Sequence, residues 1–139
     1  MDRSRITTRT PGQRLGDAAE ALVADRLVAD GWTILGRNVH LGRKEIDIVA
    51  LDPGPPPAVV LVEVRWRARR DFGLPEDTFG WRKRANLRAA LGRLLETGSL
   101  PGGGTLPAAT LRIDLVVVEP ARTRDGGPVI RHHRDALAG

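Results

Sequence analysis

Residues 45–52 read EIDIVALD, and residues 59–67 read VVLVEVRWR after a proline-rich connection. Both stretches have the length and the apolar content of β-strands. The connection, DPGPPP at 52–57, cannot hold a strand ladder and is too short for a crossover helix, so we expect antiparallel pairing. The nearly continuous apolar run at 58–62 indicates a central strand buried on both faces. In the first strand, alternation places Ile46 and Ile48 on one face and Asp47 and Val49 on the other.

The rest of the chain supplies two helices and three further strands. Apolar periodicity predicts helices near 12–30 and 78–97, and strands are expected at 32–40, 110–119 and 129–133. Thr10-Pro11-Gly12-Gln13 has the form of a capping box, and Gly31 is a stop signal. The order α-β-β-β-α-β-β predicts an α/β protein with a mixed β-sheet flanked by helices. We expect residues 1–11 to form a flexible basic tail and residues 12–139 a single domain.

Composition excludes several functional classes. The absence of cysteine excludes disulfides, thiol catalysis, Cys-ligated zinc and iron–sulfur clusters. The adjacent His132 and His133 would point to opposite faces of a strand, which argues against a zinc site. Aromatic residues make up 4% of the chain, which argues against a multi-aromatic stacking platform. No apolar run reaches membrane-spanning length and no signal peptide is visible, so the sequence predicts a cytoplasmic protein with no membrane partner.

The chain is basic, with a net charge of +5, and much of this charge is clustered. The members of the two clusters are Arg65, Arg67, Arg69 and Arg70, and then Arg82, Lys83, Arg84, Arg88 and Arg93. Basic clusters close in sequence are typical of a surface that binds a polyanion, above all nucleic acid. The alternative is coding preference for arginine, because Lys44 and Lys83 are the only lysines among 22 basic residues.

Two acidic residues lie where the strand pattern expects apolar side chains. Asp47 and Glu63 each stand in mid-strand between two aliphatic residues. Burying an ionised carboxylate is costly unless it is paired or binds a metal ion. Mg²⁺ prefers oxygen ligands and needs only one or two carboxylates, so the hairpin is a candidate Mg²⁺ site, with Arg65 on the same face as Glu63. The alternative is that both acids pair with arginines or lie on a solvated sheet face.

Glu20 and Asp114 are weaker candidates. Glu20 lies at the margin of the apolar stripe of the first helix, from which its carboxylate can reach the sheet edge. A lone glutamate at such a border is more often a surface charge. Asp114 lies in a strand two residues after Arg112, and we favour an internal pair with Arg112, or a bond to the backbone, over catalysis.

Several motifs follow one another in a defined order. They read GDAAEA at 16–21, GWTILGRN at 31–38, EIDIVA at 45–50, VEVR at 62–65 and RIDLVV at 112–117. This series, over about residues 12–120, resembles the YraN-like family, a group of small bacterial proteins regarded as candidate endonucleases. The resemblance implies a restriction-endonuclease-like PD-(D/E)XK fold similar to that of Holliday-junction resolvases. It also implies Mg²⁺- or Mn²⁺-dependent hydrolysis of phosphodiester bonds in DNA, including branched or structured DNA.

The resemblance further implies roles for individual residues. Carried over by position, Glu20 is the helix acid, Asp47 is the central metal ligand and Glu63 is the second. The backbone carbonyl of Val64 would complete the metal site.

One position departs from the family pattern, which has lysine where this chain has Arg65. Arginine does not release a proton in proteins, although it can neutralise charge on a phosphate. Lys83 matches another lysine of the pattern and is a candidate substitute cation. The alternatives for Lys83 are a phosphate contact or plain solvation.

Three functions remain open at this level. The first is a metal-dependent endonuclease whose basic clusters hold DNA beside the acids. The second is a nuclease-fold module that binds nucleic acid without cutting it, which Arg65 motivates. The third is a structural or protein-interaction domain whose charge reflects coding preference. Resolvase-like enzymes are often dimers because a four-way junction has two symmetric cuts, so a homodimer is a further expectation.

Overall fold

One five-stranded sheet with a helix on each face forms the framework of the protein. The computed structural model describes residues 8–67 and 80–137. In chain order the elements are α1 (Pro11–Ala29), β1 (Thr33–Leu41), β2 (Lys44–Asp52), β3 (Ala58–Trp66), α2 (Trp81–Thr97), β4 (Thr110–Glu119) and β5 (Val129–His133). The expected α/β class and the order α-β-β-β-α-β-β are confirmed.

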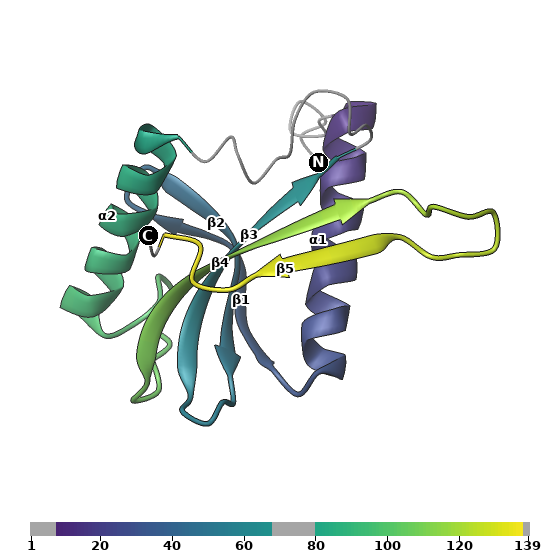
Figure 1. Ribbon diagram of the computed structural model, residues 1–139. Coiled ribbons are helices and arrows are strands. Elements are labelled where there is room, and N and C mark those ends of the chain that lie inside the picture. The colour runs from purple at the N-terminus through teal and green to yellow at the C-terminus, as the bar shows by residue number, and fades with distance from the viewer. Residues whose placement is uncertain (1–7, 68–79, 138–139) are drawn as a thin grey trace, which may run out of the picture.

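The strands lie side by side in sequence order, from β1 to β5. β3 and β4 are parallel, and the other neighbouring pairs are antiparallel, so the sheet is mixed as expected. α2 lies in the long connection that a parallel pair requires. α1 covers one face of the sheet and α2 covers the other (Figure 1). The central place expected for β3 is confirmed, and residues 58–63 of this strand are all buried.

The core consists of two apolar layers, one on each face of the sheet. The layer under α1 contains Val23 and Ile48, and the layer under α2 contains Leu87, Val49 and Leu61. Successive residues of a strand point to opposite faces, so β2 and β3 contribute to both layers. Packing on both sides fixes these two strands and therefore fixes the side chains at their ends.

Strand β2 departs from regular alternation near its beginning. Ile46 packs under α2 together with Val49, whereas Ile48 packs under α1. The prediction that Ile46 and Ile48 share a face is therefore wrong. The paired residues of β2 and β3 run only as far as Ile48 and Val62. The regular ladder stops beyond this pair. There the backbone N–H of Val64 in β3 donates to the carboxylate of Asp47 and not to the backbone of β2.

The start of α1 matches its local sequence signals. The Thr10 hydroxyl accepts a hydrogen bond from the Gln13 backbone at 3.1 Å, and the Gln13 side chain accepts one from the Thr10 backbone at 2.9 Å. This confirms the capping box. Pro11, the last residue of the expected tail, is the first residue of the helix. Arg9 already contacts Asp17 of α1 at 2.7 Å, and residues 1–7 lie outside the described part of the chain.

The other helix ends depend on glycine. Gly31 follows α1 with φ of +91°, and Gly98 ends α2 in the left-handed region with φ of +63°. Glycine adopts these conformations without the steric penalty that a Cβ would bring. Within the described residues α2 begins at Trp81, and positions 78–79 of the predicted helix lie outside them. No helix in the described ranges is long and apolar enough to cross a membrane.

Candidate functional site

The candidate site lies where β2 and β3 stop pairing. Asp47 Oδ2 accepts a hydrogen bond of 2.8 Å from the backbone N–H of Val64. A buried N–H needs an acceptor, and here a side chain supplies the one that the partner strand would otherwise provide. The carboxylate of Asp47 is therefore fixed between the two strands, beside the end of the ladder. Figure 1 shows the end of β3 pointing towards the N-terminal half of α1.

Glu20 of α1 reaches this carboxylate, so the role expected for the helix acid is geometrically available. Its side chain is hydrogen-bonded to Asp47. Burial raises the pKa of Glu20 to about 7, and the charge of Asp47 and the hydrogen bond to it act in the same direction. Burial also raises the pKa of Asp47, reinforced by the negative charge of Glu63. Glu20 and Asp47 thus share a proton below about neutral pH.

Glu63 lies on the other side of Asp47 and is held by two lysines. Its side chain is 6% exposed, and its Oε1 lies 2.7 Å from the ammonium of Lys83 in the first turn of α2. The ammonium of Lys44, at the start of β2, lies 3.4 Å from both Glu63 oxygens. Oε2 is buried and accepts no hydrogen bond within the described residues. Glu63 therefore keeps acceptor capacity that an additional cation could use.

Lys44 is the site residue that the sequence reasoning missed. It stands at the end of a two-residue turn, where a lysine normally indicates only solvent exposure, yet its side chain is 19% exposed. The amino-acid composition did contain a signal that pointed to Lys44. Lys44 and Lys83 are the only lysines of a chain that otherwise uses arginine, and both contact the same carboxylate. Coding preference for arginine alone does not explain this convergence.

Arg65 lies two residues after Glu63 on β3 and is partly exposed. Its positive charge acts on Lys83 across the site. Burial lowers the pKa of Lys83, the contact with Glu63 opposes that effect, and the charges of Arg65 and Lys44 reinforce it. Lys44 and Lys83 thus contact the buried carboxylate of Glu63, and Arg65 adds a third positive charge near Lys83. The mutual repulsion of these cations favours the approach of an anion.

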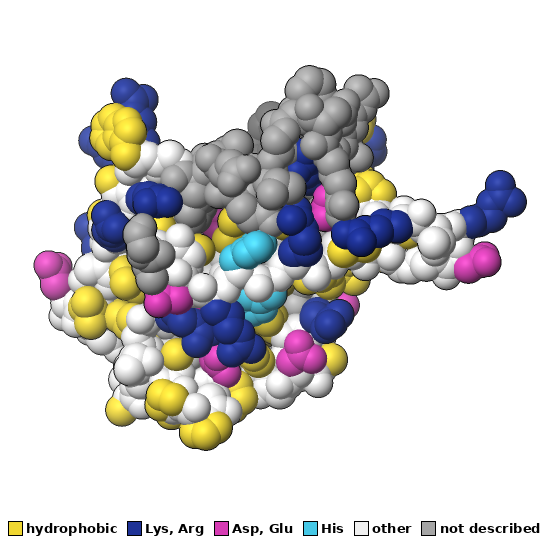
Figure 2. Space-filling model, in the orientation of Figure 1, with side chains coloured by type: hydrophobic (Ala, Val, Ile, Leu, Met, Phe, Trp, Pro, Cys, Tyr) yellow, Lys and Arg dark blue, Asp and Glu magenta, His cyan; other side chains and the backbone are white. Residues whose placement is uncertain are grey.

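The predicted nucleic-acid-binding residues occupy different environments. Arg82 and Arg88 are exposed on α2, and Arg84 is partly exposed. Arg67 is buried at 8% exposure, so its guanidinium does not belong to the exposed basic surface. Arg69 and Arg70 lie outside the described residues. Figure 2 shows Lys and Arg side chains at the upper end of α2 and across the adjoining face.

A basic cleft lies between the β1–β2 turn and α2. It has a volume of about 320 Å³ and is lined by residues that include Arg43, Lys44, Asn86 and Arg93. The same Lys44 that contacts Glu63 thus also lines this cleft. The cleft offers positive charge next to the carboxylates, which is an arrangement suited to a phosphate backbone.

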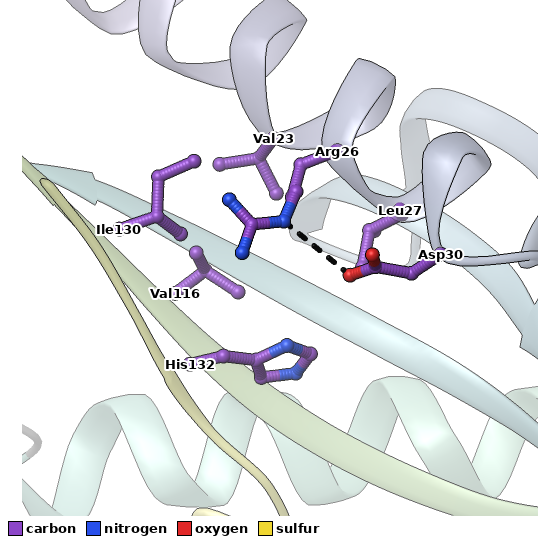
Figure 3. Close-up of a pocket in the computed structure, with 7 residues that line it drawn as sticks. All are labelled: Val23, Arg26, Leu27, Asp30, Val116, Ile130 and His132. Atoms are coloured by element: carbon purple, nitrogen blue, oxygen red, sulfur yellow. Dashed lines mark ion pairs between the residues drawn. The ribbon is translucent and has the colours of Figure 1, made fainter. Parts of the chain in front are cut away.

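A second acidic cluster, around Asp114, has a different character. Arg112 contacts both carboxylate oxygens of Asp114, at 2.8 and 3.0 Å, and the backbone of Asp135 donates a further hydrogen bond. The expected internal pair with Arg112 is present. His132 Nε2 lies 2.8 Å from Asp114, and its ring also borders the small pocket of Figure 3 between α1 and β4–β5.

The donor atoms at the site suit a hard divalent cation better than a metal that needs many protein ligands. Within residues 8–67 and 80–137, no group of three or more His, Cys, Asp and Glu side chains is arranged to hold a metal ion. Mg²⁺ needs only one or two carboxylates, and it completes its coordination with water and substrate oxygens. The hydrogen-bond-free Oε2 of Glu63 and the fixed carboxylate of Asp47 fit this requirement. A bound cation would neutralise the negative charge of Glu63, which Lys44 and Lys83 now balance.

The Glu20–Asp47 contact predicts an unusual pH dependence of stability. A raised pKa in the folded state means that stability is greatest below the unfolded pKa and decreases as pH rises towards about 7. In EDTA, the Tm of the wild type is expected to fall between about pH 5 and about pH 8 relative to that of Glu20→Gln. Asp25→Asn, exposed on the same helix, is the control. Parallel Tm profiles for the wild type and Glu20→Gln would contradict the shared proton.

The fold and the site together define an α/β protein with a carboxylate–lysine cluster at the open end of its central hairpin. The model of "Uncharacterised protein family UPF0102" matches residues 19–118. The chain belongs to this family, which is the YraN-like family that the sequence motifs indicated.

Individual relatives cover most of the chain. The UPF0102 protein of Bifidobacterium longum (strain NCC 2705) is 35% identical over 129 residues, covering 92% of this chain and 95% of the relative. That of Symbiobacterium thermophilum is 37% identical over 109 residues, covering 78% and 84%. That of Streptomyces coelicolor is 39% identical over 123 residues, covering 86% and 85%. The residues that the family model matches, 19–118, span Glu20, the β2–β3 hairpin and α2.

Proposed function

We propose that the protein is a metal-dependent endonuclease that hydrolyses phosphodiester bonds in DNA. The observation that carries the proposal is the meeting of Asp47, Glu63 and both lysines of the chain at one point beside a basic cleft. The PD-(D/E)XK resemblance supports the same reading, because it assigns the acids at 20, 47 and 63 to one site. The structure brings these three acids into one chain of interactions.

The residues that would hold Mg²⁺ or Mn²⁺ are Asp47 and Glu63, with the carbonyl of Val64 as a further ligand. When bound, the cation would polarise the phosphate and lower the pKa of a nearby water. Asp47 is already oriented by Val64, and the proton that it shares with Glu20 would leave the pair when a cation binds. Metal binding is therefore expected to release protons.

The proposed reaction consumes one water molecule. The water oxygen forms a bond to phosphorus, and the bond from phosphorus to one bridging oxygen breaks. The electron pair leaves with that oxygen, which takes up a proton, while the proton lost by the attacking water passes to solvent. The products are a phosphate monoester and a free hydroxyl group, and the cations at 44, 65 and 83 would stabilise the extra negative charge of the transition state.

Arg65 and the two lysines have different parts in this proposal. Arg65 can bind a phosphate in a bidentate manner but cannot carry a proton. Lys83 is held close to Glu63, and we assign it the role of fixing that carboxylate. The ammonium of Lys44 lies farther from Glu63 than that of Lys83 does. Lys44 is therefore the lysine that can more easily leave Glu63 and contact a phosphate oxygen.

Lys44→Gln is therefore expected to lower cleavage about 10²-fold, the typical effect of losing one charge-stabilising donor. Its effect on DNA affinity in EDTA should be much smaller, because one phosphate contact among many is lost. Adding Arg65→Lys to Lys44→Gln should restore part of the rate. Arg124→Gln, exposed in the β4–β5 connection, is the control. Equal losses in cleavage and in binding would show that Lys44 is an ordinary phosphate contact.

The proposal is tested by incubating the purified chain with labelled single-stranded, duplex, flapped and four-way-junction DNA. Cleavage is expected with Mg²⁺ or Mn²⁺ and not with EDTA. The junction also tests the homodimer, since two symmetric cuts made within one binding event require two copies of the chain. Absence of cleavage on every substrate with both metals would overturn the proposal.

One alternative has a specific observation in its favour. The guanidinium at position 65 and the two ammonium groups at Glu63 neutralise the site without a metal, as a nuclease-fold module that only binds nucleic acid would allow. Such a module should bind DNA in a strongly salt-dependent manner that divalent metal does not change. It should also gain no cleavage from Arg65→Lys.

A further inference from the structure

The side chain of Trp81 is far more exposed to solvent than those of the other two tryptophans of the chain. Trp32 is 5% exposed and lies in the core under α1, and Trp66 packs against the same core. Trp81, the first residue of α2, is 75% exposed and is the most exposed large apolar side chain in the described ranges. A tryptophan ring carries one of the largest apolar areas of any side chain, so its exposure is costly unless a partner covers it.

The surroundings of Trp81 are strongly basic. The guanidinium of Arg82 lies over its ring, 5.4 Å from the centroid. Arg82, Lys83, Arg84 and Arg88 follow it along α2, and the first acidic residue of the helix is Glu96, in its last turn. The region around the start of α2 therefore presents positive charge and an aromatic face together. Figure 2 shows Lys and Arg side chains beside a hydrophobic side chain at the upper end of this helix.

This combination favours a nucleic-acid strand over a lipid surface. A helix that binds a membrane inserts an apolar face, but the apolar face of α2, with Leu87, Ala90 and Leu94, is buried in the core. A nucleic-acid strand complements both features, because its phosphates match the arginines and its bases can stack on an aromatic ring. A base inside a duplex has both faces covered by its neighbours, so only an unpaired base could stack on Trp81.

The position of Trp81 links it to the candidate site. Lys83, two residues further on, contacts Glu63; it lies about 3 Å further along the helix axis than Trp81 and about 200° around it. A strand that crosses the start of α2 on its way to Glu63 would therefore meet the exposed ring before it reaches the carboxylate. We propose that Trp81 is a stacking site for an unpaired nucleobase and directs strands with unpaired bases towards the carboxylates. This inference rests on the proposed function for its ligand, a nucleic-acid strand, but it requires no cleavage.

The test measures binding in EDTA, so that cleavage plays no part. Fluorescently labelled single-stranded DNA and a blunt duplex of the same sequence are titrated at low salt with the wild type, Trp81→Ala, Trp81→Phe and Leu95→Ala. Trp81→Ala is expected to weaken single-strand binding about 5- to 150-fold and duplex binding much less. Trp81→Phe should retain most of the affinity because it keeps an aromatic face. Leu95, 69% exposed near the other end of α2, is the matched control and should not matter.

The outcomes separate this inference from the proposed function. Single-strand binding should also quench tryptophan emission in the wild type and not in Trp81→Phe. Unchanged affinity in Trp81→Ala, equal losses for single strand and duplex, or a response to anionic vesicles in place of DNA would each overturn the stacking site. Cleavage that fails while Trp81 still discriminates the two DNAs would overturn only the endonuclease. Thermal unfolding of each variant checks that the fold is intact.

Discussion

Asp47→Asn is expected to abolish metal-dependent cleavage, with a loss of at least about 10²- to 10³-fold. Asparagine keeps an oxygen that can accept the hydrogen bond from Val64, so the strand ends should stay in place. What is lost is the negative charge that would bind the cation. The folded protein should be no less stable above neutral pH, because the substitution removes a buried charge next to Glu63.

Two measurements check this expectation. Titration with Mn²⁺ in a calorimeter should show binding to the wild type and a large loss of affinity in Asp47→Asn. Glu45→Gln is the matched control, since Glu45 lies two residues away, is half exposed and pairs only loosely with His40 at 3.9 Å. Full cleavage by Asp47→Asn would remove the central residue of the proposed site, and an equal loss in Glu45→Gln would point to a non-specific charge effect.

Asp114→Ala is expected to give the largest loss of stability, about 3–5 kcal/mol in the free energy of unfolding. The Asp114 side chain is fully buried and binds Arg112, His132 and the backbone of Asp135. Removing it leaves the guanidinium of Arg112 with its contacts to Asp52 and to the Trp32 ring, and it leaves the backbone N–H of Asp135 without its acceptor. The effect should appear in urea unfolding as a lower midpoint.

The same carboxylate gives a pH dependence of opposite sign to that of Glu20. Burial would raise the pKa of Asp114, but the hydrogen bonds from His132, Arg112 and Asp135 outweigh it and lower the pKa. A lowered folded-state pKa means that this contribution is present above the unfolded pKa and lost in acid.

The control for Asp114→Ala is Asp30→Ala, which breaks an exposed pair with Arg26 and should cost less than about 1 kcal/mol. A loss of similar size in both variants would contradict the role of burial.

The parts of the fold that follow from local sequence signals were predictable. The capping box at Thr10, the stop at Gly98 and the buried run of β3 each depend on a few consecutive residues. The Arg112–Asp114 pair was also predictable, because residues two apart on a strand share a face. The antiparallel hairpin of β2 and β3 follows from a connection too short for any other arrangement.

The details of the candidate site required the three-dimensional structure. Strict alternation failed at Ile46, because the ladder ends and Asp47 bonds to a backbone N–H in place of the partner strand. Lys44 was missed because its place in the sequence is a turn, and only the tertiary structure brings it to Glu63. Arg67 was expected on the surface because basic residues surround it in sequence, whereas the structure buries it beside β4.

The open end of the hairpin also bears on how a loss of the proposed activity in a descendant could be recognised. Asp47 serves the fold by accepting the Val64 amide, so an inactive descendant would still be under pressure to keep an acceptor there. Glu63 is buried and its two lysines are partly buried, and apolar residues of similar volume often replace such an ionic group at little cost or with a gain in stability. The residue at position 63, rather than the one at position 47, therefore shows whether a descendant has kept the site or lost it.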